Sequence, residues 1–352
     1  MLGAITGSYL GTTRVQSSVH FTVAYSSEKL AWMGEIKPLF EEWWAEEHPE
    51  MSIRVEFQRY GSVDSFVSIL TGENHPVVWS PASSIWIPIF KTRWQAQGGV
   101  HANEVVVANV SRVIFSPLVI ATWQSFAEEN EITGFSSLHQ LISTTPGLVK
   151  LAHTDPRSSN SGFMAVIMAV SAYTGKEPAD LTLEDLVDPG LQAWMREFES
   201  AAVQWGTSTG FLADLMVQLG PAAVNVAIIY ENLVAEVSND YPGEKVVAIY
   251  PEEGTLYSDH PFCVLNASWV TKDQQFVGNE FLRFLQRPDI VSRATTVGFR
   301  PINASIPLDP DAFDFEKTGV SAAFQSPELE VPQSGEVIER IPDLWLITRP
   351  TA

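Results

Sequence analysis

Residues 153–162 read His-Thr-Asp-Pro-Arg-Ser-Ser-Asn-Ser-Gly and lie between two apolar runs, 148–152 and 163–173. This order predicts a strand, a polar turn and a buried helix, with four capping-type residues and a glycine at the start of the helix: Ser158, Ser159, Asn160, Ser161 and Gly162. Unpaired backbone N–H groups and the helix dipole at such a start favour an anion or a carbonyl oxygen. One such residue is enough for an ordinary N-cap, which is the alternative interpretation. Four in a row indicate a binding site.

Two more pairs of hydroxyl residues follow apolar runs. Ser26 and Ser27 follow the run 21–25, and Ser83 and Ser84 come soon after the run 77–79. Each pair precedes a predicted helix, so N-capping explains either pair alone. The carboxyl ends of parallel strands meet at one edge of a sheet, where ligands collect. We therefore expect these pairs and the segment 158–162 to surround one ligand.

The elements that must position these residues alternate regularly. Runs 21–25, 53–57 and 77–79 predict strands, and 28–47 and 63–70 have helical spacing. A β-α-β-α-β order predicts a parallel sheet with helices on both faces. After a strand at 114–121 the pattern starts again. At 352 residues the chain exceeds one comfortable core, so two α/β domains are expected.

Composition excludes several function classes. With 42 Asp and Glu against 21 Lys and Arg, the net charge of -21 makes nucleic acid and anionic membranes improbable partners. The one cysteine, Cys263, excludes a disulfide framework and a multi-cysteine metal cage. The seven histidines lack the spacing of a helical zinc site, and phosphate-loop and dinucleotide-turn motifs are missing from the sequence. We expect no cofactor and no resident metal.

The order of these motifs resembles the type II extracellular solute-binding proteins of ABC transporters, in the broad group with the molybdate- and sulfate-binding proteins. The resemblance covers residues 21 to about 301. It rests on six segments: Tyr-Ser-Ser-Glu-Lys at 25–29, Ser-Pro-Ala-Ser-Ser at 80–84, 115–121, 155–162, Ile-Tyr-Glu-Asn-Leu at 229–233, and Gly-Phe-Arg-Pro at 298–301.

The resemblance implies two Rossmann-like lobes with mostly parallel sheets, joined by two crossing strands. The first lobe would be residues 21–117 plus 262–352, the second 118–261, and residues 1–20 an N-terminal extension. A small polar solute would be captured by hinge closure and delivered to an ABC permease by an extracytoplasmic monomer. Since the first twenty residues show no export signal, this expectation assumes a missing or trimmed one.

Carried over by position, the ligand-binding residues would be Ser27 or Ser26, Ser84 or Ser83, Ser159 to Gly162, and Tyr230. Ser158, the adjoining Glu231 and the aromatic Tyr257 complete the candidate site. Asp155 and Asp259 add further carboxylates near the proposed cleft. These acids widen the expected solute from an oxyanion to a metal ion or a small organic molecule.

An enzyme is the alternative, because Gly206-Thr207-Ser208-Thr209-Gly210 matches the Gly-x-Ser-x-Gly pattern of a serine hydrolase. That motif requires a strand before the serine and a helix after it. The apolar spacing of 191–205 predicts a helix, so the strand is missing, and Ser208 is expected to cap a helix or to join the cleft. A ligand-sensing module of the same fold is a third possibility.

Overall fold

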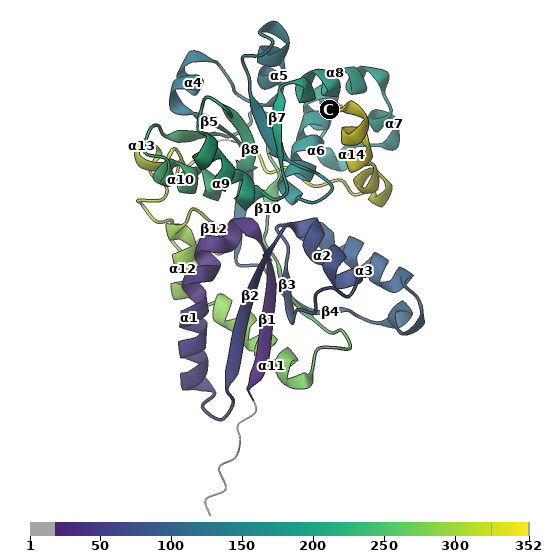
Figure 1. Ribbon diagram of the computed structural model, residues 1–352, viewed down its shortest axis with the longest axis vertical. Helices are drawn as coiled ribbons and strands as arrows, with labels where there is room; N and C mark the ends of the chain where they lie inside the picture. The colour runs from purple at the N-terminus through teal and green to yellow at the C-terminus, as the bar shows by residue number, and fades with distance from the viewer. Residues whose placement is uncertain (1–17, 325, 351–352) are drawn as a thin grey trace, which may run out of the picture.

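The computed structural model describes residues 18–324 and 326–350 and consists of two α/β lobes stacked end to end (Figure 1). The first lobe has a five-stranded sheet in the order β2-β1-β3-β11-β4. The second has the path β10-β5-β8-β6-β7, with β9 and β12 also pairing with β5. Within the sheets, β1 pairs in parallel with β2 and β3, and β6 pairs in parallel with β7 and β8. The two-lobed α/β prediction is confirmed.

The first lobe packs helices on both faces of its sheet, as its β-α-β-α-β order requires. Its strands are β1 (Val19–Ser26), β2 (Ile53–Tyr60), β3 (Val78–Ser80), β4 (Val107–Ser111) and β11 (Phe262–Leu265). Its helices are α1 (Leu30–Glu47), α2 (Ser62–Leu70), α3 (Trp86–Ala96), α11 (Lys272–Leu285) and α12 (Pro288–Thr296), with short 3-10 turns η1 (Ser27–Lys29) and η2 (Gly99–Asn103).

The second lobe repeats this alternation with more helices. Its strands are β5 (Ile114–Trp123), β6 (Leu151–Thr154), β7 (Ala202–Gly206), β8 (Val226–Tyr230), β9 (Val246–Ile249) and β10 (Tyr257–Ser258), joined by β12 (Arg300–Pro301). Its helices are α4 (Gln124–Glu129), α5 (Phe135–Thr144), α6 (Asn160–Thr174), α7 (Leu183–Leu186), α8 (Pro189–Ser200), α9 (Thr209–Leu219) and α10 (Glu231–Asp240), with η3 at Pro178–Asp180.

Two strand pairs carry the chain across the junction of the lobes. β4 lies in the first sheet and is followed after two residues by β5 in the second. β10 pairs antiparallel with β5, and three residues later β11 begins in the first sheet. The chain crosses between the lobes at residues 112–113 and 259–261, close to the boundaries at 117 and 262 that the resemblance implies.

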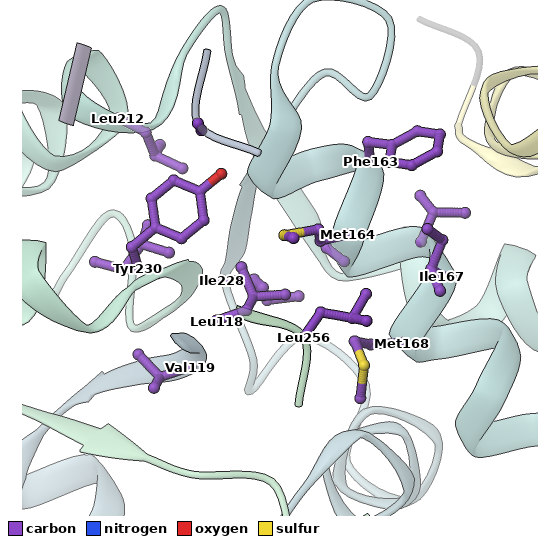
Figure 2. Close-up of a cluster of buried hydrophobic side chains, with 14 of the residues drawn as sticks. Leu118, Val119, Phe163, Met164, Ile167, Met168, Leu212, Ile228, Tyr230 and Leu256 are labelled. Atoms are coloured by element: carbon purple, nitrogen blue, oxygen red, sulfur yellow. The ribbon is translucent and has the colours of Figure 1, made fainter. Parts of the chain in front are cut away.

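The apolar core continues from one lobe into the other. One cluster fills the face of the first sheet beneath α1, α11 and α12, and a second runs from the opposite face into the second lobe. Its bridge is the contact between Trp86 and Phe163, whose ring centroids are 5.0 Å apart. Figure 2 shows the part within the second lobe, where Tyr230 packs among side chains such as Met164, Ile228 and Leu118.

The C-terminal segment packs on the second lobe, whereas the sequence prediction had assigned 262–352 to the first. Helix α13 (Phe315–Thr318) contacts α10 and β9, and helix α14 (Gly335–Thr348) contacts α6, α7 and α8, as its place in Figure 1 shows. The physical cause is an apolar stripe along α14 that is buried against this lobe: Val337, Ile341, Leu344 and Trp345. The stripe has helical spacing, but it lies in a segment rich in proline, which does not favour a helix.

One helix boundary lies at a proline. The apolar spacing of residues 274 to about 297 predicts a single helix, but the structure has two, α11 and α12, because Pro288 begins a new helix at its first position. Residues 1–17 of the expected N-terminal extension lie outside the described part of the chain. Within that part, no helix is long and apolar enough to cross a bilayer.

Candidate functional site

Four helical segments begin at the junction of the lobes, each as the next element after a strand. η1 and then α1 follow β1, α6 follows β6, α9 follows β7, and α10 follows β8. The residues before the three second-lobe helices are Ser159, Ser208 and Tyr230, and none of these uses its own side chain to cap its helix. Their polar groups are therefore available for contacts across the junction, where the helix starts provide a positive field.

Ser27 of the first lobe reaches into the start of α9. Its hydroxyl donates to Ser208 Oγ over 2.8 Å and accepts from the backbone N–H of Gly210 over 3.0 Å. A Cβ atom at Gly210 would lie 2.8 Å from the carbonyl oxygen of Ser27, closer than real Cβ contacts. The lobes can therefore approach this closely only with glycine at 210.

Asn160 at the start of α6 joins three elements. Its Oδ1 accepts from the indole N–H of Trp86 in the first lobe over 2.8 Å. Its Nδ2 donates to the hydroxyls of Tyr230 over 2.8 Å and Ser258 over 3.0 Å. All four side chains are buried except for a small fraction of Trp86. The amide thus holds together both lobes and the second crossing strand.

Hydroxyls fill the space between α6 and α9. Thr209 donates to Ser161 over 2.7 Å and lies 3.4 Å from Ser159, and Ser161 also bonds Thr154 over 2.8 Å. Gly162 donates its N–H to Thr154 Oγ1 over 2.7 Å. In this arrangement the polar groups of the candidate site bond one another, and a solute would have to replace some of these bonds.

Ser158 contributes through its backbone. Its carbonyl oxygen accepts from the N–H of Val63 in α2 over 3.0 Å, and its hydroxyl donates to the carbonyl of Thr207. A Cβ at Gly61 would lie 2.9 Å from Ser158 O. This is a second place where only glycine permits the close approach of the lobes.

Beneath Ser26 lies a buried ionic cluster that sequence reasoning missed. The Lys29 ammonium donates to Ser26 Oγ and to the carbonyls of Ser80 and Pro81, and lies 3.6 Å from Glu28. Burial lowers the pKa of Lys29 to about 8, against the opposing attraction of Glu28. Burial would raise the pKa of Glu28, but Lys29, His260 and Ser26 together lower it to about 2. Three oxygens accept from the Lys29 ammonium and stabilise its charged form. Lys29 is therefore a structural cation and does not act as a base that activates Ser26.

The signal for this cluster was present in the sequence. Charged residues follow a predicted strand in Ser-Ser-Glu-Lys at 26–29 and precede the apolar run that begins at Phe262 in Asp-His-Pro at 259–261. Charges are rarely buried unless they are paired. Pairing Glu28 with His260, however, requires two segments more than 230 positions apart in the chain, which spacing alone does not reveal.

The other serine pair lies beside this junction in an open groove. Ser83, Ser84 and Tyr257 line a cavity of about 990 Å³ between the start of α3, the crossing strands and the tail segment 328–333. Ser84 donates its N–H to Asp259 Oδ1 over 2.7 Å, and the ring of Tyr257 stacks on Phe115 at 5.0 Å. The structure thus divides the predicted residues between a closed junction and an adjacent groove.

The carboxylates expected to change the solute are already engaged. Glu231 forms a two-pronged ion pair with Arg300, at 2.7 Å for each contact, and accepts from the Tyr250 hydroxyl. Burial raises the pKa of Glu231, while Arg300 opposes that rise. Asp155 pairs with Arg157 of its own turn, and Asp259 with Arg112 at 3.3 Å. Among the residues described, no group of three His, Cys, Asp or Glu side chains could hold a metal ion.

The local context of Ser208 differs from the sequence prediction. Residues 202–206 form strand β7 and α8 ends at Ser200, so a strand does precede Ser208 and helix α9 follows it. The spacing of apolar residues in the run Ala-Val-Gln-Trp at 202–205 is compatible with a helix or a strand. The run forms a strand because it pairs with β6. A serine hydrolase also needs a histidine beside its serine. Here the hydroxyl partner of Ser208 is Ser27, and His260, which follows Ser208 in the sequence, lies beside Glu28.

No protein-family model and no curated protein match this chain. Several solved structures do match it. A periplasmic thiamin binding protein superposes with a TM-score of 0.66 at 13% identity, covering 99% of this chain and 100% of the other. The chain has the fold of the periplasmic solute-binding proteins.

Two further structures agree. The periplasmic binding protein AfuA from Actinobacillus pleuropneumoniae, with exogenous fructose-6-phosphate bound, has a TM-score of 0.64 at 16% identity, covering 95% of this chain and all of its own. A putative spermidine/putrescine ABC transporter protein from Listeria monocytogenes has a TM-score of 0.66 at 13% identity, with 94% and 99% covered. The solutes in these titles differ in charge and shape, so the fold alone does not select one.

Proposed function

We propose that this chain is an extracytoplasmic solute-binding protein that captures a small polar solute between its lobes and presents it to an ABC permease, without catalysis. The observation that carries the proposal is the meeting of polar side chains from both lobes at the ends of strands: Ser27 and Trp86 from the first, Asn160, Ser208 and Tyr230 from the second. A solute that replaces these direct contacts would bridge the lobes and report occupancy through closure.

The proposed contact residues are those predicted from the sequence, with unequal support. Ser26, Ser27, Ser158, Ser159, Asn160, Ser161, Gly162 and Tyr230 lie at or beside the closed junction, and Ser83, Ser84 and Tyr257 line the groove that leads away from it. Glu231 is the weakest candidate, because Arg300 and Tyr250 already occupy its carboxylate. It supports the site by fixing the start of α10.

The decisive experiment combines binding with shape. A thermal-shift screen of thiamin, spermidine, putrescine, fructose-6-phosphate, sulfate, molybdate and divalent metal ions would find candidate solutes, and isothermal titration would measure their affinity. Small-angle X-ray scattering with and without the best solute would then report the lobe angle. We expect saturable binding of one solute class together with a change in the lobe angle. Binding that leaves the lobe angle unchanged, or no binding across the panel, would contradict the proposal.

The hydrolase alternative has its own test. Ser208 stands between a strand and a helix, as a nucleophile elbow requires. The proposal expects no turnover of p-nitrophenyl acetate above the rate of the Ser208→Ala variant. Hydrolysis by wild type that this substitution abolishes would show that the protein is an enzyme and would contradict the proposal. A sensing role would instead appear as closure on solute binding in a protein that binds no permease.

A further inference from the structure

His260 is in an unusual conformation on the second crossing connection, between β10 and β11. Its φ of 40° makes it the one non-glycine residue with positive φ in the described part of the chain. Such a backbone costs on the order of 1–3 kcal/mol, and it persists only where the surroundings impose it. The backbone N–H of His260 is bonded to the carbonyl of Ala82, which fixes the loop against the first lobe.

The ring of His260 is fully buried and has no satisfied nitrogen. Its Nδ1 lies 3.2 Å from Glu28 Oε1, but neither ring nitrogen makes a hydrogen bond of acceptable geometry to any described residue. Its edges meet the rings of Phe299 at 5.0 Å and Tyr230 at 5.9 Å. A buried polar group left without a partner destabilises the state that buries it.

The second lobe supplies the cover over this ring. Tyr230 and the start of α10 belong to that lobe, and Asn232 donates its side-chain N–H to the carbonyl of Glu28 over 3.2 Å. The positive end of a helix disfavours a cation near it. Opening the lobes would withdraw α10 and let water reach His260, so burial of the ring depends on closure.

We propose that His260 makes closure acid-sensitive: a protonated ring at this position favours the open lobes and releases the solute. This inference rests on the proposed function, because it assigns a regulatory role to the same junction. Among the described residues, Glu28 is the one carboxylate in contact with the ring, and it is shared with Lys29 and Ser26. Its attraction is therefore insufficient to stabilise a second cation beside Lys29.

The sign of the effect follows from the states of the ring. Burial lowers the pKa of His260 in the closed form, with Lys29 also opposing the cation and Glu28 partly favouring it. In the open form water restores the ordinary value near 6.5. A group whose pKa is lower when closed binds its proton preferentially when open, so closure is lost as pH falls through about 6.5. Between pH 7.5 and pH 5 the closed population can fall up to about thirtyfold relative to the open one.

The other ionisable groups around the ring do not reverse this sign. The cage of Lys29 is built by Ser26, Ser80 and Pro81 of the first lobe, so opening leaves it intact. Asp259 also raises the pKa of His260, less than burial lowers it, and its carboxylate is bonded on the groove side by Ser84 and Arg112. Burial raises the pKa values of Tyr230 and Cys263, which keeps both uncharged at neutral and acidic pH.

The test measures the lobe angle by small-angle X-ray scattering and the affinity for the best solute of the panel at pH 7.5, 6.5 and 5.0. His260→Asn removes the titrating ring and keeps a residue that tolerates positive φ. His139→Asn is the matched control: that ring also has a pKa lowered by burial, but it stacks on Trp194 within the second lobe. We expect acid opening in wild type and His139→Asn, and none in His260→Asn.

Each outcome separates the two proposals. Solute-driven closure that does not change with pH, or acid opening that persists in His260→Asn, overturns the role of His260 and leaves solute binding standing. Failure of every solute to close the lobes overturns the proposed function, while ligand-free opening with pH still reports on His260. If His260→Asn does not fold, NMR titration of His260 is compared in wild type and in Gly61→Ala, whose added Cβ should hold the lobes apart. Equal His260 pKa values in the two proteins would refute the inference.

Discussion

Trp86 of the first lobe donates its indole N–H to the side-chain oxygen of Asn160 in the second lobe over 2.8 Å, and its ring packs on Phe163 at 5.0 Å. One side chain thus provides both the polar and the apolar contact across the junction. Because both contacts exist only when the lobes meet, Trp86 stabilises the closed state more than it stabilises either lobe.

Replacing Trp86 by Phe keeps an aromatic ring and removes the donor. Asn160 Oδ1 would then be buried without a partner, at a cost of about 1–3 kcal/mol to the closed state. We expect scattering to show a more open molecule. Trp94→Phe is the control, since its indole bonds Glu104 within the first lobe. An equal effect from both variants would mean that Trp86 supports the first lobe alone.

The close approach of the lobes at Gly210 gives a steric prediction. Alanine there would place a Cβ 2.8 Å from Ser27 O and 2.7 Å from Arg59 Nη2. The guanidinium can move, but the carbonyl is backbone and must shift with its lobe. We therefore expect Gly210→Ala to hold the lobes apart and to weaken solute binding at least tenfold, with little change in the unfolding temperature.

The control for that steric effect is Gly34→Ala in the second turn of α1. A Cβ at Gly34 meets nothing within 4 Å, and alanine favours a helix interior by about 1 kcal/mol over glycine. This variant should close normally and unfold at a higher temperature. Closure of Gly210→Ala to the wild-type lobe angle would show that the contact at Ser27 is not limiting.

Sequence pattern predicts candidate residues more readily than it predicts their contacts. The hydroxyl pairs and the segment 158–162 are candidates because strand ends and helix starts are local signals. The pairing of Glu231 with Arg300 was not found, since it joins positions 69 apart and removes the carboxylate from the cleft. Likewise, the run 202–206 fits two periodicities, and only its neighbour β6 makes it a strand.

The pair of Glu231 and Arg300 predicts a large stability effect from a single truncation. Arg300→Met would leave Glu231 buried without its cation, at a cost of roughly 3–5 kcal/mol in the free energy of unfolding. Glu231→Gln combined with Arg300→Met should recover part of that loss, because no unpaired charge remains. Urea unfolding of Arg300→Met, of Glu231→Gln and of the double variant measures this, and additivity of the two substitutions would contradict the coupling.

An exposed ion pair supplies the comparison. Arg293 and Glu35 join α12 to α1 with both side chains partly in solvent. Such pairs contribute about 0–1 kcal/mol. We expect Arg293→Met to change the free energy of unfolding by less than about 1 kcal/mol, so the size of the Arg300 effect reports burial and not the loss of an arginine.

The pH dependence of stability should report the buried Glu28. Its pKa of about 2 lies below the ordinary 4.5, so its contribution is present above pH 4.5 and is lost as pH falls from 4.5 toward 2. The shift corresponds to roughly 3 kcal/mol. We expect Glu28→Gln to lower the free energy of unfolding by about that amount at pH 7 and to converge with wild type near pH 2. A constant difference across this range would mean that the loss comes from packing around Lys29 and not from the charge of Glu28.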